Sequence, residues 1–362
     1  MTQTQTKTLR PWEREGVGVP VAGRLTTGEA LAVTKHDYIV DKVRMMTSPR
    51  IDYVIDEGTG QPATDADGCK IVDRSTSQNS DLFGIYNPVQ CMTVRRDTRS
   101  YLGTVGVDYK VVQNTEFCEF FDEALGQNAA CINAVGTLGR FGARIFLVAQ
   151  VPEMLEVVPG DPIERHILLT STHDGSGNIE ARFIAWREES NAMVHTPGEI
   201  VKIQHSKNAM KRLRLAPMVL AKNVEYWERA KRAYAYMAKT DVNSQQLREF
   251  LAAMFPDIID RDEDGNEIDR RTSAQAQKAR NEIEALFAGE APGSSQAGRT
   301  AWGLYNAVAY FVDHDRRQSK KQREWQISRW ETSVFGNGAA LRERAYNYLK
   351  PRRVLLPGEK LA

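Results

Sequence analysis

Ten cationic side chains lie close together in the middle of the chain, and their chemistry is that of phosphate binding. Residues 202–239 contain ten lysines and arginines against two glutamates, a local charge of +8, whereas the whole chain of 362 residues has a formal net charge of +1. Lys207, Lys211 and Arg214 fall at the i, i+4, i+7 spacing of one helix face. Long cationic side chains on a rigid element suit a nucleic-acid backbone, because docking releases condensed counterions. We therefore expect a phosphate-binding surface here; a purely solvated helix face is the alternative.

The same pattern indicates which side chains would contact a nucleic acid. The central cations are Lys202, Lys207, Lys211, Arg212 and Arg214. Four arginines of the predicted sheet and two histidines extend this binding surface: Arg140, Arg144, Arg182, Arg187, His173 and His205. An aromatic side chain among cations can stack on an unpaired base, so Tyr226 is the expected stacking residue. Trp227 and Tyr234, which are seven residues apart, are expected in a core stripe instead.

Other patterns point only weakly to enzymes or metal sites. The segment from His173 through Asp174 to Ser176 holds the residue types of a hydrolase, but neighbours on one hairpin do not converge as nucleophile, base and orienter. Residues 260–271 begin like a calcium loop, yet Arg271 stands where the twelfth position requires Glu. The histidines show no metal-binding spacing. We therefore expect no catalytic residue, metal or cofactor, with a metal-dependent nuclease that uses His173 and Asp174 as an alternative.

Strand patterns dominate the first half of the chain. Runs of β-branched and aromatic residues predict strands at 38–43 and 51–55, a long loop over 58–81, and a hairpin from 89–96 and 101–103. Asn114 or Thr115 then caps a predicted amphipathic helix that ends at Gly126. Further strands are predicted at 132–138, 143–151, 166–172, 179–187 and 200–205.

Helical spacing dominates the second half. Helices are predicted at 207–239, 243–254, 273–288, 300–315 and 339–349. Pro217 is a candidate kink in the first of these, and the Asp-rich residues near 260 indicate an acidic surface loop. The expected fold class is therefore α+β: a strand-rich N-terminal half, with an antiparallel β-meander and a packed helix, followed by a helical C-terminal half.

Composition sets the expected boundaries and compartment. We expect a flexible N-terminal tail at 1–27, an α+β core with the basic helix at 28–239, a helical region at 240–350, and a C-terminal tail at 351–362. No stretch reaches the roughly 18 apolar residues of a membrane-spanning helix. The four cysteines lack C-x-x-C spacing, which suits a reducing compartment. A soluble, cytoplasmic protein without membrane partners is expected.

Several separated motifs resemble one known family. They are residues 102–106 with 109–114, the turn at 173–176, residues 204–208, residues 300–308 with Asp313 and His314, and residues 335–340. In this order they resemble the phage- and plasmid-like family of unknown function numbered nine-three-two, over residues 28–350. Residues 186–192 depart from the family's pattern, which commonly reads Cys-x-Asn-Thr-Leu there. The resemblance implies a gene of phages, prophages or plasmids and brings no settled activity.

The order of strands, helix, meander and basic helix is also similar to the core of the single-strand annealing proteins of the Erf and Red-beta kind, which form rings on single-stranded DNA. By this likeness of architecture we expect a non-enzymatic protein that binds and anneals single-stranded DNA in recombination, without ATP, as a homo-oligomeric ring or filament. The alternative is a structural or host-interaction protein of mobile elements. In that case the basic helix binds an acidic partner and the acidic loop at 257–269 binds another copy.

Overall fold

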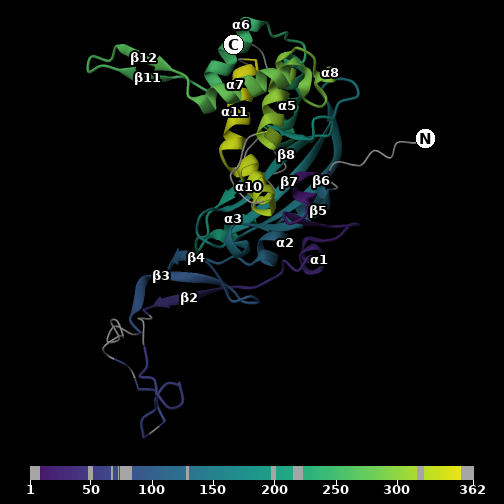
Figure 1. Cartoon of the computed structure of the whole chain (residues 1–362). Coiled ribbons are helices and arrows are strands. Elements are labelled where there is room, and N and C mark those ends of the chain that lie inside the picture. The colour runs from purple at the N-terminus through teal and green to yellow at the C-terminus, as the bar shows by residue number, and fades with distance from the viewer. Residues whose placement is uncertain are drawn as a thin grey trace, which may run out of the picture.

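The computed structural model describes residues 9–47, 52–66, 68–71, 73, 84–127, 130–196, 201–214, 223–315 and 322–351. It confirms the α+β fold class: two antiparallel sheets lie mostly in the N-terminal half of the chain, and the helices gather in the C-terminal half. The smaller sheet lies at one end of the main sheet, and most of the C-terminal helices lie toward the other end (Figure 1). None of the described helices is both long and apolar enough to cross a bilayer.

The main sheet has seven antiparallel strands, four of them in the predicted meander. Its spatial order is β1-β5-β6-β7-β8-β10, and β9 pairs with β8. The strands are β1 (Gly18–Pro20), β5 (Cys131–Leu138), β6 (Arg144–Glu156), β7 (Pro162–Thr172), β8 (Ile179–Arg187), β9 (Ala192–Val194) and β10 (Val201–Ile203). Arg144 pairs with Thr172, and Ile179 pairs with Ile203, so the β5–β6 turn, the β7–β8 turn and the end of β10 lie at the same end of the sheet. We call this the loop end.

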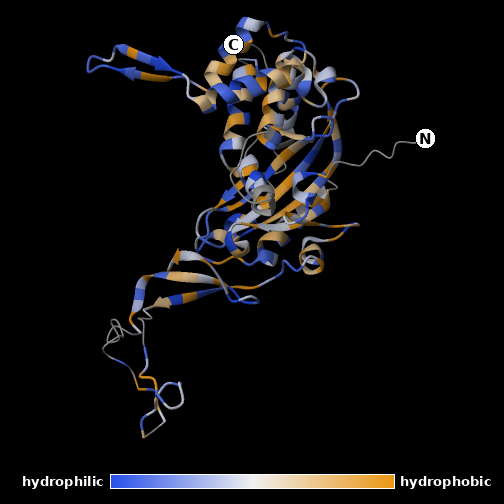
Figure 2. Cartoon of the chain, viewed as in Figure 1, coloured by the Kyte–Doolittle hydropathy of each residue, from blue (hydrophilic) through white to orange (hydrophobic). Residues whose placement is uncertain are grey.

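Both faces of the main sheet are covered, because its central strands are apolar on both sides. One face presents Leu147 and Leu169 to helices α1, α2 and α3. The other face presents Phe146 and Trp186 to Trp12 and to helix α10. The covering elements are the 3-10 turn η1 (Pro11–Glu13), α1 (Thr27–Val33), α2 (Asn114–Gln127), α3 (Ala209–Leu213) and α10 (Gln322–Phe335). Figure 2 shows apolar residues along the strands of the main sheet. A sheet packed on both sides holds the turns at its ends in fixed positions.

The smaller sheet packs against the loop end. It consists of β2 (Val40–Met46), β3 (Tyr86–Arg95) and β4 (Ser100–Gly106). The Tyr38 hydroxyl donates to the carbonyl of Gly142 at 2.9 Å, and the Thr93 hydroxyl donates to the carbonyl of His173 at 2.5 Å. The antiparallel pairing of β3 with β4 confirms the predicted hairpin, and these two bonds attach the smaller sheet to the main sheet. The strand predicted at 51–55 is wrong: within residues 52–73 the described backbone forms isolated bridges such as Ile55 with Pro62.

The C-terminal helices form a second core around aromatic side chains, to which strands of the main sheet contribute residues such as Leu155 and Ile163. Tyr234, Trp302 and Tyr305 are fully buried, and the ring of Tyr305 stacks on those of Tyr234 and Trp302. The ring centroids of Tyr234 and Trp302 are 4.9 Å apart, with the planes inclined by 45°. The helices are α5 (Asn223–Met237), α6 (Ser244–Met254), α7 (Ala274–Ala285), α8 (Ser294–Ala297), α9 (Ala301–Tyr310) and α11 (Asn337–Leu349), with π-helical turns η4 (Leu286–Glu290) and η5 (Phe311–Asp315). The burial of Trp227 and Tyr234 confirms the predicted core stripe.

Three local predictions are corrected. Residues 9–27 are not a tail, because Trp12 is fully buried and β1 pairs with β5. The described residues of the helix predicted at 207–239 belong to helices on different cores: α3 packs on the main sheet, whereas α5 packs among the C-terminal helices. The candidate kink at Pro217 lies outside the described residues. The residues expected as an acidic loop near 260 form a hairpin, β11 (Ile258–Arg261) and β12 (Glu267–Arg271), that projects from the body (Figure 1).

Candidate nucleic-acid interface

The loop end owes its shape to backbone conformations that glycine tolerates. Gly139, Gly142 and Gly175 have φ angles of 73°, 80° and 79°, in the left-handed region that favours glycine. Gly103 of β4 lies so close to the β7–β8 turn that a Cβ atom built on it would be 2.5 Å from the Cα of Asp174. The small sheet and the turn at 173–176 are therefore in direct backbone contact.

The motif residues of three separate segments meet at this place. Tyr109, which follows β4, donates its hydroxyl to the carbonyl of Thr172 at 2.7 Å. Its ring stacks on the ring of His205, with centroids 4.8 Å apart and planes inclined by 17°. The His205 Nδ1 lies 3.2 Å from the carbonyl oxygen of Lys110, so this nitrogen carries the hydrogen and donates it. The segment after β4, the β7–β8 turn and the end of β10 are thus joined by side-chain contacts.

His173 is at the centre of the junction and is fully buried. Its Nε2 lies 2.8 Å from the Asn114 Oδ1, and the Asn114 amide nitrogen donates to the carbonyl of His36 at 2.8 Å. The second bond fixes the orientation of the amide, so the Nε2 of His173 donates to Asn114. Burial lowers the pKa of His173 to about 3 and that of His205 to about 4, which keeps both rings neutral at pH 7.

The two histidines are therefore removed from the predicted DNA contacts, because neither is a cation nor exposed. His205 is 7% exposed, and the hydroxyl of the buried Ser171 lies 3.4 Å from its Nε2. The Asp174 Oδ1 accepts hydrogen bonds from the Ser176 backbone at 2.9 Å and the Ser176 hydroxyl at 2.7 Å, and its negative charge acts on both histidines. Within the described residues, no group of three or more His, Cys, Asp and Glu side chains is placed to hold a metal ion.

The predicted arginines occupy three different environments. Arg187 is fully buried and its Nε lies 2.6 Å from the Oδ1 of the equally buried Asp161, so it supports the fold and is removed from the predicted interface. Arg144 and Arg182 contact the ring of Phe335 from the same sheet face, and Arg182 also pairs with Glu180. Arg140, in the β5–β6 turn, is exposed beside the ring of Phe141.

The central cations are exposed, as the sequence predicts. The side chain of Lys202 is 54% exposed and lies 3.8 Å from Glu180, and that of Lys207 is 81% exposed and lies 2.9 Å from Asp108. Pairs this exposed are weak, so a phosphate can replace the carboxylate. Lys211, Arg212 and Arg214 are also exposed, and none of them forms an ion pair within the described part of the chain. The side chain of Tyr226 lies outside the described residues.

Sequence reasoning missed two lysines of the same surface. Lys42 of β2 donates from its Nζ to the carbonyls of Val107 and Tyr109, at 2.8 and 2.9 Å, and Lys110 is exposed one residue further along. Both flank the loop that carries Asp108, the partner of Lys207. Neither lysine belongs to the basic segment at 202–239. They lie near Lys207 because the small sheet packs against the loop end. Conversely, Lys231 and Lys239 of that segment lie on and just after α5 in the helical half.

The fold and this site define an α+β protein with a cationic surface at one end of its sheet, built around a pair of buried neutral histidines. The chain belongs to the family described as Domain of unknown function (DUF932), whose sequence profile matches residues 101–334. This match is shorter than the resemblance over 28–350, but it includes α2, the meander, α3 and all three motif segments of the loop end. Neither the curated proteins nor the solved structures include a match to the chain.

Proposed function

We propose that this protein binds single-stranded DNA at the loop end and anneals complementary strands in the recombination of phage or plasmid DNA, without ATP. The observation that supports it best is that exposed cations gather at the loop end, on the end of β10 and α3 and, across the sheet, in the β5–β6 turn. These cations are Arg140, Lys202, Lys207, Lys211, Arg212 and Arg214, with Lys42 and Lys110 beside them. Exposed cations on a rigid platform attract a phosphate backbone of any sequence.

The shape of the surface favours an unpaired strand over a duplex. Helix α3 is only five residues long, too short to lie along a major groove and read base edges. The neighbouring sheet instead presents the ring of Tyr101, which is 44% exposed, and its hydroxyl lies 2.7 Å from that of Thr104. Single-strand binders combine cations for the backbone with exposed rings for the bases. Tyr101 is thus a stacking candidate in the described part of the chain.

Salt dependence of oligonucleotide binding tests the proposal. About five neutralised phosphates give a slope of about −3.5 for log affinity against log salt, from about −0.7 per contact on single strands. Replacing Lys207, Lys211 and Arg214 together with Ala is expected to flatten the slope to about −1.4. The matched control replaces Lys231, Lys239 and Arg248, which are exposed in the helical half, and removes the same charge. Fluorescence anisotropy with a labelled oligonucleotide measures both slopes.

Three outcomes contradict the proposal, two for DNA binding at the loop end and one for annealing. If both triple variants change the slope equally, binding depends on net charge and the loop end is not the site. If the wild type degrades the oligonucleotide when magnesium is added, the protein is a nuclease instead. Strand annealing is then measured without ATP, from the quenching of two labelled complementary oligonucleotides. An annealing rate no faster than that of the oligonucleotides alone would leave DNA binding without the proposed recombination activity.

A further inference from the structure

The hairpin of β11 and β12 is an arm without a core of its own. Eight of its nine strand residues are exposed, and it projects from the end of the molecule that carries α6 and α7 (Figure 1). Three isoleucines nevertheless lie on it: Ile258, Ile259 and Ile268 are 44%, 36% and 66% exposed. An isolated two-stranded hairpin is only marginally stable in water, and exposed β-branched residues on free strand edges favour association.

The tip of the arm is acidic. Asp262, Glu263 and Asp264 are consecutive and exposed where the chain turns from β11 to β12. The Asp262 carboxylate accepts from the backbone of Asn266 at 2.7 Å, which closes the turn, and Arg261 donates to the carbonyl of Gly265 at 2.7 Å. The arm therefore combines an apolar stretch with a negative tip.

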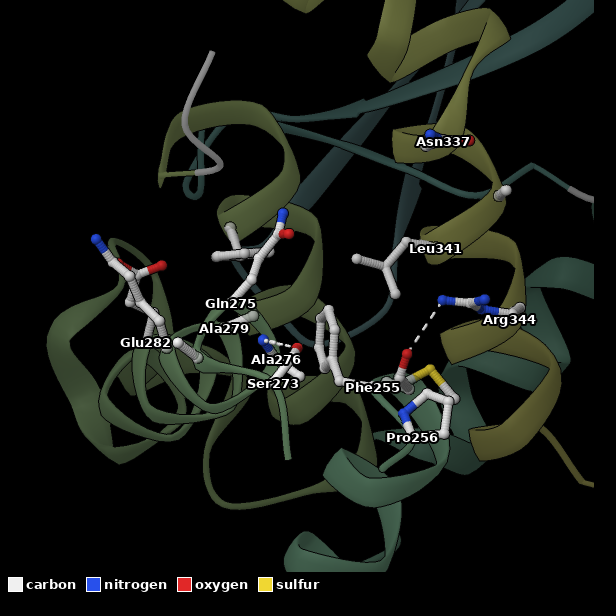
Figure 3. Close-up of a pocket in the computed structure, with 15 residues that line it drawn as sticks. Phe255, Pro256, Ser273, Gln275, Ala276, Ala279, Glu282, Asn337, Leu341 and Arg344 are labelled. Atoms are coloured by element: carbon white, nitrogen blue, oxygen red, sulfur yellow. Dashed lines mark hydrogen bonds and ion pairs between the residues drawn. The ribbon is translucent and has the colours of Figure 1, made fainter. Parts of the chain in front are cut away.

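A groove with the complementary character lies at the foot of the arm. Its volume is about 800 Å³, and Figure 3 shows it between α7 and α11. The apolar lining includes Phe255, Phe311 and Leu341. Two cations line it as well: Lys278, which is 49% exposed, and Arg344, whose guanidinium donates to the carbonyl of Met254 at 3.1 Å.

The carboxylate nearest to these cations does not cancel them. Glu282 lies 3.4 Å from the Nζ of Lys278, as an i, i+4 pair in which the glutamate is 33% exposed. Exposed pairs of this kind contribute little and are readily exchanged for another carboxylate. The groove thus has an apolar floor and a net positive edge. Both features are complementary to the arm, which carries exposed isoleucines and an acidic tip.

We propose that this groove receives the arm of a second copy of the chain, in a symmetric dimer. One residue at each end, Asp257 or Thr272, joins the arm to Pro256 and Ser273, and both Pro256 and Ser273 line the groove. If two arms lie antiparallel beside a two-fold axis, each tip reaches the foot of the other arm, where the partner's groove opens. Ile268, the isoleucine nearest the tip, then enters the apolar floor, and the acidic tip meets Lys278 and Arg344. Ile258 and Ile259, at the base of the arm, face the tip half of the partner's arm. The inference is independent of DNA binding, because the arm and the cationic loop end lie far apart (Figure 1).

Sedimentation equilibrium of the full chain without DNA tests the dimer. The wild type is expected to have the mass of a dimer at high concentration. Lys278→Glu is expected to raise the dimer Kd about tenfold or more, because the new glutamate repels the acidic tip of the partner's arm. Ile268→Asp is expected to raise it by a similar factor, because a buried apolar contact is lost. Glu263→Lys combined with Lys278→Glu is expected to restore much of the affinity. The control Lys231→Glu reverses an exposed charge on α5, away from the groove.

Every other result overturns the proposal. A wild type that stays monomeric at all concentrations excludes the dimer. A dimer that Ile268→Asp weakens but Lys278→Glu leaves unchanged places the arm on another surface. A dimer that the Lys207, Lys211 and Arg214 triple variant weakens places the acidic tip on the loop end of the neighbour. Far-ultraviolet circular dichroism of each variant shows that the fold is intact, which is expected because the arm and Lys278 contribute no core residue.

Discussion

At the scale of single residues, burial separates the arginines that hold the fold from those available to a ligand. Arg187 and Asp161 are both fully inaccessible, and a second nitrogen of Arg187 donates to the carbonyl of Gly293 at 3.0 Å. Arg187→Ala leaves Asp161 as an unpaired buried charge, so the free energy of unfolding is expected to fall by about 3–5 kcal/mol. Urea denaturation measures this. The exposed control Arg212→Ala is expected to stay within about 0.5 kcal/mol of the wild type.

The same variant tests the correction made to the interface. Provided enough folded protein remains, Arg187→Ala is expected to bind oligonucleotides with the wild-type salt slope, because Arg187 does not reach the surface. A flattened slope together with unchanged stability would return Arg187 to the DNA-binding residues.

Buried histidines give the protein an acid-sensitive fold. Burial lowers the pKa of His166 and His173 to about 3, and that of His195 and His205 to about 4. In the unfolded chain these rings take up protons near pH 6.5, whereas in the folded protein they do not until pH 3–4. Their contribution to stability is therefore complete above pH 6.5 and falls as the pH drops toward 4, by about 1.4 kcal/mol per pH unit for each ring.

His166 offers a specific test of this pH dependence. The Oε2 of Glu164 is 3.7 Å from its Nε2, but that carboxylate is already bound by Arg10 at 2.6 and 2.7 Å. The ring packs edge-on against Trp12, so His166→Phe keeps the shape and removes one titrating group. Between pH 7 and pH 5 the unfolding free energy of the variant is expected to fall less steeply with pH than that of the wild type. The difference in slope corresponds to about one proton fewer taken up on unfolding. An unchanged slope would show that His166 is protonated in the folded state.

The sequence alone predicted the burial of a residue correctly where that burial depends on a single helix or strand. The seven-residue spacing of Trp227 and Tyr234 placed them correctly in a core, because one helix face determines that burial. Arg187 was misplaced because its partner, Asp161, precedes the neighbouring strand, and strand alternation says nothing about which charges meet across a sheet. The burial of His173 likewise depends on Asn114 from another element.

At the scale of elements, the contact between β4 and the β7–β8 turn holds the small sheet at the loop end. Gly103→Ala would place a Cβ atom 2.5 Å from the Cα of Asp174, so the two backbones must separate. The expected cost is about 1–3 kcal/mol, with faster hydrogen exchange in β2, β3 and β4 than in the main sheet. Gly106→Ala is the matched control on the same strand, since nothing lies within 4 Å of its added Cβ. Equal effects of the two substitutions would contradict this contact.

The elements that sequence predicted correctly are those whose own residues determine them. The meander was found because its strands carry long β-branched runs bounded by glycine turns. The helix expected at 207–239 failed because α3 and α5 pack on different cores, which helical periodicity does not reveal. The arm was taken for a loop because its apolar residues are few and spaced among aspartates, so the strands form without any buried face.

At the scale of the whole molecule, the proposed dimer and the proposed annealing activity make a joint prediction. Annealing requires that two strands meet, and a dimer linked through the arms holds two loop ends in one particle. Tethering the sites raises the effective concentration of the second strand without any new DNA contact. Lys278→Glu is therefore expected to leave the Kd for a short oligonucleotide unchanged while it slows annealing of complementary strands about tenfold or more, and adding Glu263→Lys is expected to restore the rate.

The comparison between the two assays decides how the two ends of the molecule cooperate. If Lys278→Glu weakens binding of the short oligonucleotide as much as it slows annealing, the substitution acts on the loop end itself and the two regions are not separate. If the variant is monomeric yet anneals at the wild-type rate, one loop end holds both strands. In that case the arm serves assembly alone, because the cationic surface of a single chain would suffice to neutralise two phosphate backbones.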